Sequence, residues 1–196
     1  MAWSHPTGPE SDPQGRQGPA LLTGHPGRFQ IRGLDRRDAP LLAAHLLRLS
    51  PEDRRTRFHG ALHDDAVTAY VDRIDWRRAY VFGAIVGTEL RGVAELIVES
   101  DSRGEIAVSV EPDFRHDGLG RLLVIAAMLA ARRLGLKQLL LTYQPGNTPM
   151  VTLARDLGAR TERRHQAVEA VITLSPQPPT ETGAPPAPQA PEYSPS

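Results

Sequence analysis

The sequence contains no cysteine, which excludes a disulfide framework, a thiolate metal site and a cysteine nucleophile. It has no excess charge either, since 23 basic and 23 acidic residues give a formal net charge of +0. A neutral chain lacks the positive field that draws proteins to phosphate backbones, so we do not expect a nucleic-acid partner. No apolar run approaches the roughly 20 residues of a membrane helix, so we expect no membrane partner. Residues 1–27 also lack the apolar centre of a secretory signal, and together these absences predict a cytoplasmic protein.

Proline and glycine are instead concentrated at the two ends of the 196-residue chain. Neither end contains enough apolar residues to offset the entropy that ordering would cost. We therefore predict a disordered N-terminal tail at 1–27, one folded domain at 28–174, and a Pro-rich disordered C-terminal tail at 175–196.

Helix and strand patterns alternate between these tails. Alternating and continuous apolar runs predict strands at 29–34, 79–86, 90–99, 105–110, 136–143 and 166–174. Helices are predicted to begin near Asp38, Ser50, Asp65, Gly120 and Pro149, with Asp38 and Ser50 as caps of the first two. This order predicts an α/β fold, in which a mixed sheet carries helices on its faces.

The most informative segment is the turn Arg115-His116-Asp117-Gly118-Leu119-Gly120, which joins a predicted strand to a predicted helix. Backbone N–H groups at a helix start are unpaired and carry partial positive charge, so they suit phosphate oxygens. Gly118 and Gly120 have no side chains that would keep a pyrophosphate from the backbone. Arg115 either adds a charged bond to the phosphate or leans back on the protein. The alternative is a tight turn that binds nothing.

This turn resembles the central motif of the GNAT superfamily of N-acetyltransferases, Arg/Gln-x-x-Gly-x-Gly/Ala, at Arg115, Gly118 and Gly120. Glu111-Pro112 before the turn and Asn147 after the next strand support the resemblance, which extends over about 29–174. It implies a GNAT-like fold, with a mostly antiparallel sheet splayed at an acyl-CoA site, and acetyl-CoA as cofactor without a metal. The residues that it implies for coenzyme binding are Val108, Val110, Arg115, His116, Asp117, Gly118, Leu119, Gly120, Arg121 and Asn147. Val108 and Val110 would pair with the pantetheine arm, and the turn would hold the pyrophosphate.

An amine must lose its proton before it attacks a thioester, because a lysine amine with a pKa of about 10.4 is almost wholly charged at neutral pH. Glu105, at the start of the strand that leads to the turn, is our candidate base, and Glu95 and Glu99 are its competitors. Bacterial protein-lysine acetyltransferases of the superfamily look similar at Glu105 and over 49–58. Many family members have a tyrosine proton donor where this chain has Ala154. Tyr143 is nearby in sequence, but we expect it to pack at the strand end.

The resemblance implies an acetyl-CoA-dependent N-acetyltransferase whose acceptor is a protein lysine. Two alternatives stay open: a small-molecule amine acceptor, and a catalytically silent CoA-binding module, which Ala154 and the Pro-rich tail suggest. The four-residue spacing of His59 and His63 would place two metal ligands on one helix face, but no third ligand is evident. The basic runs Arg54-Arg55, Arg77-Arg78 and 160–164 are expected to be solvated faces. The alternative is that they recognise an acidic protein surface or the 3′-phosphate of the coenzyme.

Overall fold

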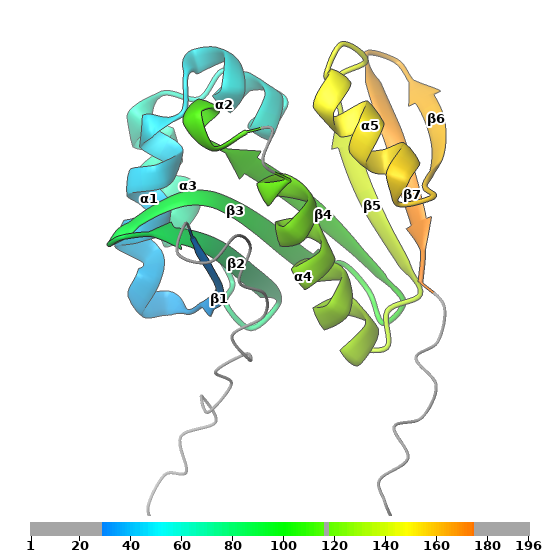
Figure 1. Cartoon of the computed structure of the whole chain (residues 1–196), viewed down its shortest axis with the longest axis horizontal. Coiled ribbons are helices and arrows are strands. Elements are labelled where there is room, and N and C mark those ends of the chain that lie inside the picture. Colours follow the sequence, from blue (N-terminus) through cyan, green and yellow to red (C-terminus); the bar gives the residue numbers. More distant parts are fainter. Residues whose placement is uncertain (1–28, 116–117, 175–196) are drawn as a thin grey trace, which may run out of the picture.

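The computed structural model describes residues 29–115 and 118–174. The two predicted tails, residue 28, and His116 and Asp117 of the predicted coenzyme site lie outside these ranges. Within them, seven strands form one sheet in the order β1-β2-β3-β4-β5-β7-β6 (Figure 1). The strands are Gln30–Leu34 (β1), Ala79–Val86 (β2), Glu89–Val98 (β3), Arg103–Val110 (β4), Gln138–Tyr143 (β5), Arg160–Arg164 (β6) and Ala167–Thr173 (β7).

Neighbouring strands run antiparallel except for β4 and β5, which run parallel because helix α4 connects them. The helices are Ala39–Arg48 (α1), Pro51–Phe58 (α2), Asp64–Asp72 (α3), Leu119–Arg133 (α4) and Thr148–Asp156 (α5), with 3-10 turns at Arg36–Asp38 and Pro112–Phe114. The prediction of a mixed, mostly antiparallel sheet in an α/β fold is confirmed.

The core consists of two apolar clusters on opposite faces of the sheet. One cluster contains Ala94 of β3 with side chains of α4 and α5, and the other contains Val93 with side chains of α1 and α3. Because successive residues of a strand point to opposite faces, these neighbours show that helices cover both faces. Among the described residues, no helix is long and apolar enough to cross a membrane.

Strand β6 was missed by the sequence analysis, which placed residues 160–164 only as a solvated basic run. All of its residues are exposed, as that run predicted, but its backbone pairs with β7 at the edge of the sheet. A strand whose residues are all exposed has no apolar alternation, so its pattern gives no strand signal. Charged side chains are typical of edge strands, since they discourage pairing with other chains.

Two other local predictions need correction. Asp38 does not cap α1 with its side chain, which instead accepts from the backbone N–H of Asp35 and pairs with Arg32. The two histidines do not share a helix face, because α2 ends at Phe58, where His59 adopts a left-handed conformation (φ 55°), and His63 precedes α3. Ser50 caps α2 as predicted, with its hydroxyl accepting from Asp53 N–H at 3.0 Å.

Candidate functional site

The sheet opens between its two parallel strands. β4 and β5 pair only where residues 103–105 lie beside 138–140, although the strands continue to Val110 and Tyr143. Figure 1 shows them diverging toward the start of α4. Beyond the paired residues, the facing edges of the two strands form no described β-ladder with each other. Peptide groups along these edges suit a ligand that carries amides of its own.

Helix α4 begins at the open end of this gap. Gly118 precedes it with φ 75°, a left-handed conformation that glycine adopts without strain. A Cβ added at Gly118 would have no described heavy atom within 4 Å, and one at Gly120 would lie 3.7 Å from Val110 Cγ2. The space at Gly118 is therefore open, whereas a Cβ at Gly120 would be in ordinary van der Waals contact with Val110. The unpaired N–H groups of the first turn make the helix start suitable for a phosphate.

Leu119 and Arg121 lie in the same first turn of α4. The side chain of Leu119 is buried in the core, whereas that of Arg121 is exposed. Leu119 can therefore contact a ligand only through its backbone, whereas the exposed side chain of Arg121 can contact one as well. Coenzyme contacts of the described residues 118–121 stay a prediction.

The Arg115 side chain forms its contacts within the protein. Its Nε donates to the carbonyl oxygen of Val110 at 2.9 Å, and its terminal nitrogen is 2.6 Å from the carboxylate of Asp53 in α2. The guanidinium thus braces the turn internally in this structure. Any direct part of Arg115 in binding phosphate would require it to exchange these partners.

Glu105 occupies the apex of the gap, as the last β4 residue in the ladder with β5. Its neighbour Ile106 packs on the α4 side, so the Glu105 side chain points to the opposite face of the sheet. Burial raises the pKa of this half-buried carboxyl, and the negative charge of Glu99 adds to the increase, while His59 and Arg57 oppose it. A carboxylate with a raised pKa is a stronger base, which suits removal of a proton from an amine.

Glu95 is not a free base. Its side chain is 1% exposed, pairs with Arg57 at 2.5 Å and accepts a hydrogen bond from the Tyr70 hydroxyl at 2.6 Å. Burial, together with this carboxylate, raises the pKa of Tyr70, so Tyr70 remains a donor. Glu99 is exposed and acts on Glu105 through its charge. Of the three carboxylates considered as the base, Glu105 is therefore the best placed to accept a proton.

The residues predicted after β5 have structural roles here. The Asn147 side chain accepts from Met150 N–H at 3.2 Å and caps α5, so its predicted contact with coenzyme stays a prediction. Ala154 is completely buried in the core, and Tyr143 is 2% exposed in the same cluster. Burial raises the pKa of Tyr143, and its packing at the strand end is as expected.

The sequence analysis missed a polar group at the end of β4. Glu111 and His45 are buried together, 66 residues apart in the chain, and Arg48, Arg91 and Ser109 complete their surroundings. The only sequence signal was His45 among the apolar positions of its helix. Pattern alone does not reveal the partner of a buried histidine.

Comparison with known proteins supports the same fold. Residues 45–159 match the model of the acetyltransferase (GNAT) family. The GNAT domain of S. lividans PAT is similar at a TM-score of 0.65 and 19% identity, over 74% of this chain and 90% of that one. A GNAT-family acetyltransferase from Streptococcus pneumoniae gives 0.62 and 20%, over 75% and 99% of the two chains. PaiA N-acetyltransferase from Thermoplasma acidophilum, solved in complex with coenzyme A, gives 0.57 and 15%, over 74% and 99%.

Proposed function

The chain belongs to the acetyltransferase (GNAT) family, and on that premise we propose that it transfers an acetyl group from acetyl-CoA to an amine, with a protein lysine as acceptor. The observation that carries the proposal is the gap between β4 and β5, with Glu105 at its apex and the start of α4 at its open end. In this proposal a single elongated ligand lies along the unpaired edges of the two strands. Its phosphates would meet the helix start while its thioester lies near the base.

The residues have separate tasks in this proposal. The first turn of α4 holds the pyrophosphate through backbone N–H groups, and the edge of β4 at Val108 and Val110 pairs with the pantetheine arm. Acetyl-CoA supplies the thioester. Glu105 takes a proton from the charged acceptor amine, directly or through water. The neutral nitrogen then bonds to the carbonyl carbon, the carbon–sulfur bond breaks, and the second nitrogen proton passes to solvent. The sulfur leaves as thiolate, which needs no acid because it is a stable anion.

A protein lysine is favoured as acceptor because the chain resembles protein-lysine acetyltransferases at Glu105 and over residues 49–58, which include α2. Ala154 has no proton to donate, so the proposed reaction uses no acid at that position. The same absence of a donor suits a silent CoA-binding module, which is the competing proposal. Turnover distinguishes the two.

The test compares the purified chain with its Glu105→Gln variant in a thiol-release assay with acetyl-CoA and lysine-containing proteins, peptides and small amines. Removing a general base should lower turnover by about 10²-fold or more. The dissociation constant for CoA should stay within about twofold, since Glu105 lies away from the phosphate turn. Glu99→Gln is the matched control, because it removes a nearby exposed carboxylate and should retain most activity.

The pH profile provides a second measure. Only ionised Glu105 accepts a proton, so the acidic limb of kcat/KM should rise as pH passes the raised pKa of this carboxyl. That limb should be lost in Glu105→Gln. Equal turnover in the variant would assign the base elsewhere, and CoA binding without turnover in the parent chain would favour the silent module. Acetylation of small amines alone would replace the lysine with a small-molecule acceptor.

A further inference from the structure

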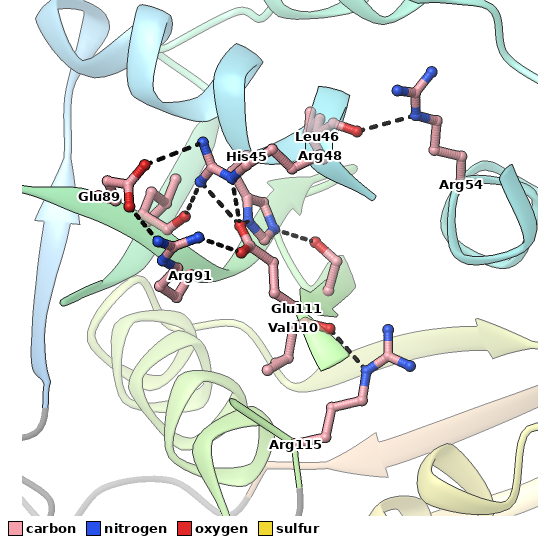
Figure 2. A network of polar contacts seen from close by, with 11 residues as sticks. His45, Leu46, Arg48, Arg54, Glu89, Arg91, Val110, Glu111 and Arg115 are labelled. Carbon is pink, nitrogen blue, oxygen red and sulfur yellow. Dashed lines mark hydrogen bonds and ion pairs between the residues drawn. The ribbon is translucent and has the colours of Figure 1, made fainter. Parts of the chain in front are cut away.

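A buried polar network joins α1 to the end of β4. The Glu111 network consists of His45, Arg48, Arg91, Ser109 and Glu111 (Figure 2). Glu111 Oε1 lies 3.1 Å from His45 Nδ1 and 2.9 Å from a terminal nitrogen of Arg48, and Oε2 is 2.7 Å from Arg91. His45 Nε2 is 2.9 Å from the Ser109 hydroxyl. One carboxylate therefore connects α1, β3 and β4.

The protonation states of Glu111 and His45 follow from their surroundings. Burial alone would raise the pKa of Glu111, but hydrogen bonds from Arg91, Arg48 and His45 outweigh it and hold the pKa below its ordinary value. Burial lowers the pKa of His45 despite the carboxylate, so this imidazole is neutral at pH 7. A carboxylate can only accept, so Nδ1–H donates to Glu111 and Nε2 accepts from the Ser109 hydroxyl. Each ring nitrogen thus has its own partner.

A second set of contacts fixes α2 to the same region. Arg54 donates to the carbonyl oxygens of Leu46 and Leu47, at 3.2 and 2.5 Å, and its side chain is largely buried rather than solvated as the sequence predicted. Arg115 donates to the Val110 carbonyl at the end of β4 (Figure 2) and pairs with Asp53 of α2, so it links the two elements. The ends of α1 and α2 are therefore tied to one short segment of backbone, residues 109–115.

The end of β4, which leads into this segment, is held from both faces of the sheet. Val108 and Val110 pack against the α4 cluster on one face, while Ser109 and Glu111 are hydrogen bonded to α1 on the other. Buried ion pairs add little stability relative to apolar packing of the same volume. Their directional bonds do fix position, and a backbone held in its binding geometry favours ligand affinity because less ordering is needed when the ligand binds.

We propose that Glu111 is a positioning residue for the coenzyme, and that it acts by holding Val108–Val110 and the described residues up to Arg115 in the geometry that binds the coenzyme. The inference rests on the proposed function. It assigns Glu111 no contact with the reacting atoms. Loss of its charge should therefore weaken coenzyme binding and leave the chemical step nearly unchanged.

The experiment compares Glu111→Gln with Glu89→Gln in the full chain. Glu89 pairs with Arg91 and lies 4.0 Å from Arg48, so it touches the same arginines, but its half-exposed carboxylate has no described bond to β4. Calorimetry should show the Kd for CoA raised about tenfold or more in Glu111→Gln and changed less than about twofold in Glu89→Gln. With saturating acetyl-CoA, kcat should stay within about threefold in both, so that the loss appears in KM.

A purely structural role predicts a different result. Circular dichroism at the assay temperature identifies the folded fraction, and a folded Glu111→Gln variant that binds CoA like the parent would overturn the inference. If Glu111→Gln does not fold, Ser109→Ala takes its place, since it removes only the hydroxyl partner of His45. It should raise the Kd about threefold, and parent-like affinity in that variant overturns the inference equally. Failure of the parent chain to bind CoA would instead refute the proposed function itself.

Discussion

Replacement of Gly120 by alanine should change stability and coenzyme affinity in opposite directions. Gly120 is the second residue of α4, and its added Cβ would lie 3.7 Å from Val110 Cγ2, an ordinary van der Waals distance. Glycine-to-alanine substitution at a compatible position stabilises proteins by about 0.4–1 kcal/mol. For a domain of this size that corresponds to a rise in Tm of roughly 1–4 °C.

The same methyl group would lie in the first turn of α4, beside the backbone N–H groups that we assign to the pyrophosphate, and would hinder its close approach. Each lost hydrogen bond to a charged group costs about 1.5–3 kcal/mol, which is roughly 10- to 150-fold in Kd. Thermal unfolding without ligand measures the first effect, and calorimetry with CoA measures the second. Gly118→Ala is the comparison, because φ 75° penalises alanine by about 1–2 kcal/mol and should lower Tm.

Two outcomes would refute this reasoning. An unchanged Kd in Gly120→Ala would place the pyrophosphate away from the start of α4. A lower Tm would show that the helix start does not accommodate the methyl group.

Two further predictions concern stability. Tyr70→Phe removes the hydroxyl that donates to buried Glu95, so urea unfolding should show a loss of about 1.5–3 kcal/mol, and a loss below about 0.5 would contradict the geometry. His45 has a lowered pKa in the folded state, so the unfolded chain binds more protons and stability should fall as pH decreases below about 6.5. His45→Gln should flatten that dependence in urea titrations at pH 7.5, 6.5 and 5.5, whereas parallel curves for the two proteins would assign it to other groups.

Much of the fold follows from local sequence. The pattern that predicts a helix from Gly120 succeeds because its residues are almost continuously apolar and glycines lie at both ends. The Ser50 cap is equally local, since serine, proline and two acids define a helix start by themselves. Asp38 has the same local signal, but Arg32 and the Asp35 backbone compete for its carboxylate. Only tertiary contacts decide between such partners.

The candidate site is predictable in its backbone and much less in its side chains. Gly118 and Gly120 are recognisable because a missing side chain is itself the requirement. The inward turn of Arg115 depends on Asp53, 62 residues earlier, and no periodicity encodes such a pair. Glu95 and Glu105 look alike in sequence, yet an arginine from α2 neutralises one of them, while the other remains half-buried at the apex of the gap.

The gap between β4 and β5 amounts to a pair of strand edges enclosed within a sheet. A ligand that forms hydrogen bonds with these edges is recognised by backbone peptide groups, which every residue except proline provides equally. Side chains along such a gap are then free to vary so long as they pack, because recognition does not depend on their identity. This is consistent with chains only 15–20% identical sharing one architecture. Low sequence identity between two such sheets is therefore no guide to whether their open edges match, because the edge is made of backbone.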